Sequence, residues 1–360
     1  MRTYFAGNTA MIRREKIVLA AGATNRLISY YHALPGGSQH LTLEWLIDLL
    51  KGNNMPEQKV RLFLDSGAFS AWTMNVPISI QDYIKFIKRH ELLFEVYANL
   101  DVIGLGGKRP NKLTAKKTLE NQKIMEEAGL TPLPCFHFGE PFEYLQYYID
   151  NYDYLALGVA GNSGTKLIPW LNTCFSNYIC DSKGMPKIKA HGFAVTSLKI
   201  MLAYPWFSVD STSWIMTGRM GKICMPIRTA DGKWLYDEHS WKIGVSNRSP
   251  SMKDKGAHYT TLSQGKLKIF MSYLEEKGYE LGESKFHIES PNYTLKDNER
   301  WASKKKKGQE TREVETIIHP GISNDYKKRD ELNILYYLDF EKSMPEWPWP
   351  FKGGKKHGFF

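Results

Sequence analysis

The sequence is poor in cysteine, and its few cysteines show no pattern that suggests a metal site or a disulfide framework. Four occur in 360 residues, with no CxxC pair and no pair of histidines beside them. A structural zinc site and a disulfide-stapled fold therefore find little support. We expect reduced thiols that mostly fill the core at Cys135, Cys174, Cys180 and Cys224.

Long apolar runs are also absent. The sequence contains no stretch of about 18 apolar residues, the length that a membrane-spanning helix needs. The first residues, MRTYFAGNTAMIRREK, contain no hydrophobic segment of the signal-peptide type. We therefore expect a soluble, cytoplasmic protein with no membrane partner. A hydrophobic fraction of 42% with 24% charged residues is ordinary for a globular protein, which excludes general disorder.

A glycine-rich nucleotide-binding loop is missing as well. No GxGxxG follows the first apolar run, and GLGG at residues 104–107 lacks the Lys and Ser or Thr that complete a phosphate loop. An open, doubly wound sheet that binds a dinucleotide is thus disfavoured.

The chain does contain a regular alternation of strand-like and helix-like segments. Polar groups follow successive strands at equal spacing, since Asp65, Asp101 and His137 are each 36 residues apart. One strand and one helix of a parallel barrel take about 30–40 residues, so the spacing predicts an α/β fold of the (β/α)8 TIM-barrel type. We expect strands at residues 16–22, 60–64, 93–101, 130–139, 154–161, 187–193 and 204–210, and a helix or loop at residues 23–34.

The sequence changes character after Arg219. Asp231-Gly232 between apolar alternations indicates a β-hairpin, four lysines at 304–307 indicate a basic loop, and the proline- and glycine-rich end indicates an irregular tail. We assign residues 1–225 to the barrel core. Residues 226–360 are expected to form a smaller C-terminal α+β portion that completes the barrel.

Three carboxylates stand at predicted strand ends: Asp65, Asp101 and Asp210. The carboxyl ends of barrel strands face one mouth, where one acid can act as nucleophile while another transfers protons. Paired carboxylates also serve glycoside hydrolases, which leaves sugar C1 chemistry in general open. Each Asp could instead only form a turn.

These segments resemble the queuine- and archaeosine-type tRNA-guanine transglycosylases, and most of all their DNA-directed relatives in bacteria and phages, the DpdA family. The family's DSGGFQ is similar to DSGAFS at residues 65–70, and its substrate-binding Asp is matched by Asp101 in ANLD. Its glycine-rich base loop resembles LGVAG at residues 157–161. The nucleophile segment resembles VDSTSWIMTGR, in which Asp210 and Arg219 keep the family's nine-residue separation.

The resemblance implies a base exchange in which Asp210 attacks C1′ of a guanosine nucleotide and expels guanine. Asp65 would transfer the proton, and Asp101 would bind the base edge. The remaining implied substrate-binding residues are Ser66, His137, Gly158, Val159 and Arg219, the last holding a phosphate. A free 7-deazaguanine base of the preQ0 kind would enter, and the target nucleotide would leave its stack.

The sequence departs from the family in its base pocket and in lacking the CxCxxC zinc motif, so we expect no metal or other cofactor. His137 stands near the family's base-reading glutamine, where it could equally be a core histidine, and Val159 replaces a glycine. His191, before a glycine, is interpreted as a turn residue. Trp72 and Trp214 could stack on a base or simply pack.

These changes favour DNA over tRNA as the substrate. The net charge of 48 − 38 = +10 agrees with a polyanionic partner. A tRNA-directed enzyme with a divergent pocket and a barrel that binds nucleic acid without catalysis remain the alternatives. If the protein is encoded by a phage, we expect it in the host cytoplasm. The sequence leaves open whether the protein forms a homodimer.

Overall fold

The computed structural model describes residues 1–7, 12–51, 60–104, 110–159, 164–237, 240–248, 254, 256–303 and 310–352. The chain forms two compact units. The first comprises Met1–Thr212 together with Phe340–Phe360, and the second comprises Ser213–Asp339.

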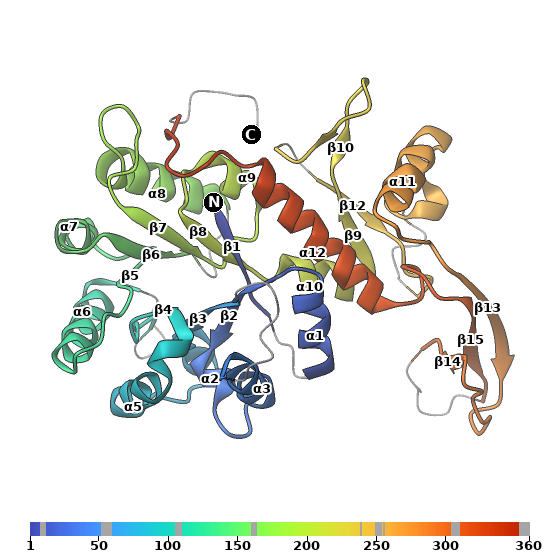
Figure 1. Ribbon diagram of the computed structural model, residues 1–360, viewed down its shortest axis with the longest axis horizontal. Coiled ribbons are helices and arrows are strands. Elements are labelled where there is room, and N and C mark those ends of the chain that lie inside the picture. The colour runs from blue at the N-terminus through green and yellow to red at the C-terminus, as the bar shows by residue number, and fades with distance from the viewer. Residues whose placement is uncertain are drawn as a thin grey trace. The chain divides into compact units, whose positions relative to one another are not determined.

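The first unit is built around a sheet of eight parallel strands (Figure 1). Their order is β4-β3-β2-β1-β8-β7-β6-β5, with β1 beside β8 in the register Tyr4 opposite Asp210. The outer strands β4 and β5 are joined by a parallel bridge between Ala98 and Leu133, so the sheet curls into a TIM-like α/β fold. The strands are β1 (Arg2–Phe5), β2 (Asn25–Ser29), β3 (Arg61–Asp65), β4 (Phe94–Tyr97), β5 (Cys135–His137), β6 (Tyr154–Gly158), β7 (Lys189–Phe193) and β8 (Ser208–Ser211).

The beginning of the barrel differs from the sequence prediction. Residues 16–22, expected as the first strand, lie mostly in helix α1 (Ile12–Ala20), whereas β1 and β2 occupy segments for which no strand was predicted. Helix α1 turns Glu15 and Val18, one helical turn apart, into the interior. A short apolar run is compatible with either a strand or a helix, which is why its periodicity was misleading.

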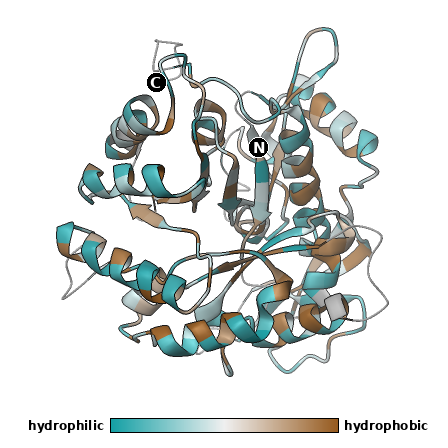
Figure 2. Ribbon diagram, turned by 60° about the vertical axis from the view of Figure 1, so that its left-hand side comes forward, coloured by the Kyte–Doolittle hydropathy of each residue, from teal (hydrophilic) through white to brown (hydrophobic). Residues whose placement is uncertain are grey.

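Helices surround the sheet, and Figure 1 shows them outside the strands. Figure 2 shows hydrophilic and hydrophobic residues alternating along these helices, as expected where one face packs on the sheet. In α5, for example, Tyr83, Ile84 and Ile87 are buried, and Ser79 caps the first turn by accepting a hydrogen bond from the Asp82 amide. The helices are α1, α2 (Tyr30–Ala33), α3 (His40–Lys51), α4 (Ala68–Thr73), α5 (Ile80–His90), α6 (Lys112–Glu127), α7 (Phe142–Asn151), α8 (Gly164–Thr173) and α9 (Leu198–Ala203), with a 3₁₀ turn at Glu91–Leu93 and a π-helical turn at Cys174–Ile179.

The apolar core of the first unit has two layers. One lies between sheet and helices, where Leu62 and Leu64 of β3 pack with residues of α3 and α5. The other fills the barrel interior, with Tyr4, Leu27 and Phe63 among its members. All four cysteines of the chain are buried and free, as the sequence predicted.

The second unit contains a two-stranded antiparallel sheet, a short hairpin and a three-stranded antiparallel sheet. The hairpin of β10 and β11 turns at Asp231-Gly232, which confirms that prediction. The elements are α10 (Ser213–Arg219), β9 (Lys222–Met225), β10 (Ile227–Arg228), β11 (Trp234–Leu235), β12 (Trp241–Gly244), a 3₁₀ turn (Tyr259–Thr261), α11 (Gln264–Glu276), β13 (Glu283–Glu289), β14 (Glu299–Trp301), β15 (Arg312–His319) and α12 (Tyr326–Ser343), whose last residues belong to the first unit.

The division between the units falls after Thr212, earlier than the expected boundary at residue 225. All eight strands of the parallel sheet precede this point, because β1 supplies a strand that the sequence prediction had not counted. The C-terminal portion returns to the first unit only from Phe340 onward, where the Glu341 carboxylate accepts a hydrogen bond from the Thr3 amide at 2.8 Å. The lysines at 304–307 lie outside the described residues. No helix in the described parts of the chain is long and apolar enough to cross a membrane.

Candidate active site

The three predicted carboxylates gather at the carboxyl ends of strands of the first unit. Asp65 is the last residue of β3, Asp101 follows β4, and Asp210 lies in β8. Asp101 and Asp210 are both less than a tenth exposed. Their negative charges both act on Asp65, so the structure brings together the acids that the sequence placed at strand ends.

Asp65 is the most perturbed of the three. Burial, and then the charges of Asp101 and Asp210, raise its pKa to about 7. Its Oδ2 accepts a hydrogen bond from the Gly67 amide at 3.1 Å. Gly67 has a φ of +78°, and a Cβ there would lie 2.4 Å from the Tyr31 Cβ, so the turn that follows Asp65 requires glycine.

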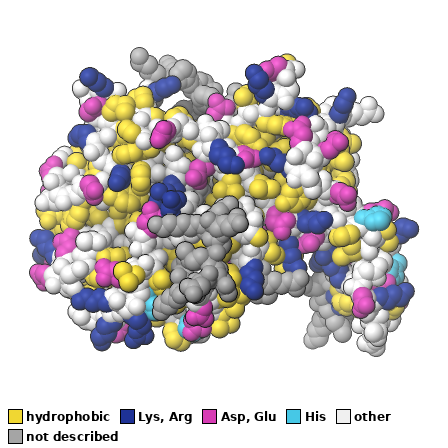
Figure 3. Space-filling view, viewed as in Figure 1, with side chains coloured by type: hydrophobic (Ala, Val, Ile, Leu, Met, Phe, Trp, Pro, Cys, Tyr) yellow, Lys and Arg dark blue, Asp and Glu magenta, His cyan; other side chains and the backbone are white. Residues whose placement is uncertain are grey.

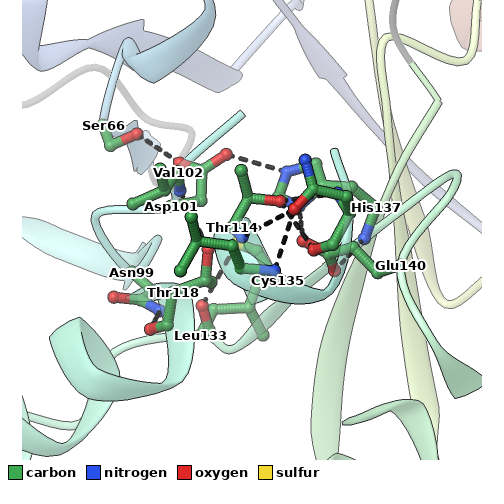
Figure 4. A network of polar contacts seen from close by, with 12 residues as sticks. Ser66, Asn99, Asp101, Val102, Thr114, Thr118, Leu133, Cys135, His137 and Glu140 are labelled. Atoms are coloured by element: carbon green, nitrogen blue, oxygen red, sulfur yellow. Dashed lines mark hydrogen bonds and ion pairs between the residues drawn. The ribbon is translucent and has the colours of Figure 1, made fainter. Parts of the chain in front are cut away.

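Asp101 is held through both carboxylate oxygens. The Ser66 hydroxyl donates to Oδ1 at 2.7 Å, and His137 Nε2 lies 2.9 Å from Oδ2 (Figure 4). The segment that carries Asp101 is fixed from α6, since the Thr118 carbonyl accepts from Asn99 and the Thr118 hydroxyl accepts from the Val102 amide. Each carboxylate oxygen has two lone pairs, so Asp101 keeps acceptor capacity for a ligand.

His137 lies between two carboxylates. Besides Asp101, Glu140 approaches Nδ1 at 3.4 Å and accepts a hydrogen bond from the His137 amide at 2.8 Å (Figure 4). Burial alone would lower the pKa of His137, but Glu140 and Asp101 outweigh it and raise the pKa to about 10. His137 is therefore an imidazolium at neutral pH. Glu140 was missed in the sequence, where FGEP after the strand gives only a turn signal.

Gly158 supports this arrangement from the neighbouring strand. A Cβ at Gly158 would lie 2.2 Å from Cδ2 of His137, so the ring occupies the space that any other residue would fill. Val159, the next residue, is buried. Residues 160 and 161 of the predicted base loop lie outside the described residues.

Asp210 is bound at one oxygen from the segment after β7. Its Oδ1 accepts a hydrogen bond from the Ala194 amide at 2.7 Å and lies 3.5 Å from His191 Nε2. Ala194 has a φ of 55°, a left-handed conformation that is strained for alanine. His191 was interpreted as a turn residue. It is instead a fully buried residue of β7 inside the barrel, which no local pattern indicates, because Gly192 after it is typical of a turn.

Arg219 and Trp214 lie in the second unit, in α10. Trp214 is fully buried, which identifies it as a packing residue. Trp72, at the end of α4, is partly exposed and packs its ring 6.0 Å from that of Phe69.

A cavity of about 650 Å³ lies at the other end of the barrel strands, lined by residues at the beginnings of β4 and β6 and before β5, among them Glu95, Leu133 and Tyr154. None of the three aspartates lines it. Within the described ranges, no group of three or more His, Cys, Asp or Glu side chains is arranged to hold a metal ion.

Comparison with family models, with curated proteins and with solved structures gives no match.

Proposed function

We propose that this protein is a base-exchange transglycosylase that replaces guanine in DNA with a 7-deazaguanine base. The observation that carries the proposal is Asp65, a partly buried acid with a pKa of about 7 next to two further carboxylates. Such a group can give and take a proton at neutral pH while its neighbour acts as a nucleophile.

The first half of the reaction forms a covalent intermediate. The Asp210 carboxylate attacks C1′ of the target nucleotide, the C1′–N9 bond breaks, and the departing guanine takes a proton from Asp65. Oδ2 is the available nucleophile, because Oδ1 is bound to the Ala194 amide.

The second half restores the enzyme. The incoming base attacks C1′ through its own ring nitrogen, the bond from C1′ to Asp210 breaks, and the ring proton passes to the Asp65 carboxylate. Protons therefore balance over the cycle, and no net acid is consumed. A pKa of about 7 for Asp65 suits both directions of this transfer.

Asp101 fits the role of base reader. A carboxylate matches the paired donors of a guanine-type edge, N1–H and the exocyclic amine. His137 has both ring nitrogens directed at carboxylates, so we assign it to the orientation of Asp101 and not to direct base contact. Ser66 orients the same carboxylate from the opposite oxygen.

DNA is proposed over tRNA because of the altered base pocket and the missing zinc motif. The net charge of +10 agrees with either polymer. On the face in Figure 3, Lys and Arg side chains stand among acidic and apolar side chains and do not form one continuous band. A target base must leave its stack to reach a buried acid, so single-stranded or flipped nucleotides are the expected substrate.

Incorporation of radiolabelled guanine tests this function. The full-length protein is incubated with labelled guanine and either DNA or tRNA, and label is counted in each polymer, with Asp210→Asn as the control. Label in DNA that is lost in the variant supports the proposal. Label in tRNA alone assigns the same chemistry to tRNA, and label in neither polymer contradicts the proposal.

A further inference from the structure

The barrel interior holds a histidine for which the proposed chemistry has no use. His191 is fully buried, and its ring packs among the rings of Tyr4, Phe63 and Phe193 at centroid distances of 6.2, 4.6 and 4.7 Å. A polar side chain at such a place costs free energy unless its nitrogens are satisfied. Nδ1 has a hydrogen-bond partner, whereas Nε2 has none among the described residues and faces only a carboxylate.

Three contacts place His191 in the middle of a polar chain that crosses the barrel. Nε2 lies 3.5 Å from Asp210 Oδ1, and Nδ1 lies 2.7 Å from the Ser208 hydroxyl. The Ser208 oxygen in turn lies 2.6 Å from the hydroxyl of Tyr154. Tyr154 lines the cavity at the opposite end of the strands, so the chain runs from the candidate nucleophile toward the far end of the barrel.

The direction of the hydrogen bonds follows from the chemistry of the partners. Burial lowers the pKa of His191, which keeps the ring neutral with a single N–H. Nε2 makes no hydrogen bond to Asp210 at 3.5 Å, but a carboxylate favours a proton on the ring nitrogen that faces it, so this N–H belongs on Nε2. Nδ1 must then accept from Ser208, and Ser208 must accept from Tyr154, whose own pKa is raised by burial so that it keeps its proton.

The same contacts distinguish the two oxygens of Asp210. The Ala194 amide and His191 both approach Oδ1. Oδ2 accepts no hydrogen bond from the described part of the chain. A nucleophilic carboxylate held at one oxygen has its other oxygen in a fixed position, and a displacement of about 1 Å can cost about a hundredfold in rate.

We infer that His191 is a positioning residue, which holds Oδ1 of Asp210 from inside the barrel and leaves Oδ2 to react. It acts as the neutral Nε2–H tautomer, which Ser208 and Tyr154 set. The inference rests on the proposed function for the identity of the reaction. The tautomer and its link to Asp210 are properties of the free protein, which makes them testable without any substrate.

The first test is nitrogen NMR of the full-length protein labelled with ¹⁵N-histidine, with His191 assigned by its loss in His191→Gln. We expect a protonated Nε2 and an unprotonated Nδ1, and a ring that takes up its second proton at a lower pH than an ordinary histidine. Asp210→Asn should shift the Nε2 resonance, and Ser208→Ala should weaken the tautomer preference. A proton on Nδ1, or an ordinary titration, overturns the inference.

The second test is kinetic. His191→Gln should lower kcat for exchange about tenfold to a hundredfold, with little change in KM for the incoming base, because the base does not touch His191. His90→Gln, the same change at the end of α5, is the matched control for loss of an imidazole. Melting curves of both variants show whether they fold. If His191→Gln does not fold, Ser208→Ala replaces it, and we expect this variant to lose kcat in the same direction but by a smaller factor.

The two tests separate the inference from the proposed function. If the wild-type protein exchanges no base but His191 shows the Nε2–H tautomer coupled to Asp210, the proposed function fails and the positioning of Asp210 stands. If exchange proceeds and His191→Gln keeps the full kcat, the positioning role is wrong and the proposed function stands.

Discussion

At the scale of single residues, charge is distributed in the site so that one carboxyl group titrates near neutrality. Asp65 accepts a hydrogen bond from the Gly67 amide, but its burial and the charges of Asp101 and Asp210 outweigh the effect of that bond on its pKa. The raised pKa of Asp65 therefore arises from the convergence of the three strands. The raised pKa of Asp65 should make the free energy of unfolding of the protein depend on pH.

Asp65→Asn should make the protein more stable than the wild type at pH 8 but not at pH 4. The pKa of Asp65 is about 7 in the folded state and near 4 in the unfolded state. Between pH 4 and pH 7 the folded wild type therefore binds a proton that the unfolded chain does not, and its free energy of unfolding falls as pH rises through this range. The gain in the variant should reach a few kcal/mol, at about 1.4 kcal/mol for each pKa unit. Chemical denaturation at both pH values measures it.

Asp150→Asn, at the exposed end of α7, is the matched control for loss of a carboxylate charge. A stability gain for Asp65→Asn that is the same at pH 4 and pH 8 would contradict the raised pKa. Asp65→Asn should also exchange base at least about a hundredfold more slowly than the wild type, because general acid–base catalysis usually contributes about that factor to the rate.

Gly158→Ala should weaken binding of the base. The new methyl group would lie 2.2 Å from the His137 ring, which must then move away from Asp101. We expect a rise of at least about tenfold in KM for the incoming base, since one charged hydrogen bond is worth about 1.5–3 kcal/mol. Gly265→Ala in α11, where an added Cβ meets nothing within 4 Å, is the control. An unchanged KM in Gly158→Ala would show that His137 does not orient Asp101 for binding.

The three aspartates could be predicted from the sequence because each follows an apolar strand, and parallel strands of a barrel end at one mouth. Glu140 and His191 could not. Glu140 approaches the His137 ring from the turn three residues further on, where a turn-forming sequence does not show which way the carboxylate points, and His191 meets Asp210 only because β7 and β8 are neighbours in the sheet. Neither contact leaves a local pattern.

At the scale of elements, the start of the barrel depends on one buried ion pair. Arg26 of β2 contacts Glu15 of α1 through Nε and Nη2 and also donates to the Phe5 carbonyl of β1. Both charged side chains are almost completely buried. The pair therefore connects three consecutive elements, and it explains why a segment beginning with Asn and Arg is an inner strand despite its polar sequence.

Arg26→Met should destabilise the protein by about 3–5 kcal/mol, because it leaves the Glu15 carboxylate buried without its partner. The double variant Glu15→Leu with Arg26→Met should recover much of this loss, since burying two apolar groups carries no desolvation penalty for charge. Urea denaturation of the single and double variants measures both effects. A double variant as unstable as the sum of the two single ones would contradict the direct pairing.

Most strands after residue 60 could be predicted, whereas β1 and β2 could not. Strands β3 to β8 follow apolar runs bounded by turn residues, and each lies within a few residues of the expected range. Strands β1 and β2 are short and contain arginine, and their burial depends on partners elsewhere in the chain. Local patterns carry no information about such partners, so the barrel was expected to begin too late and to need the C-terminal portion.

At the scale of the whole molecule, the net charge predicts how binding to nucleic acid responds to salt. Contacts with phosphates release counterions, so affinity falls as salt rises. We expect the affinity for single-stranded DNA to drop at least about tenfold between 50 and 200 mM salt, as measured by fluorescence anisotropy. Asp210→Asn should show the same dependence, because it leaves the surface unchanged. Affinity independent of salt would contradict a polyanionic partner.

The covalent step from Asp210 to the sugar is the central claim, and trapping it is the most direct test. The protein is mixed with end-labelled, guanine-containing single-stranded DNA without an incoming base, then denatured and separated on a gel. The account predicts a labelled protein–DNA band that is absent in Asp210→Asn and disappears when a 7-deazaguanine base is added. A band that persists in Asp210→Asn, or exchange of base by a wild-type protein that never forms the band, would contradict it.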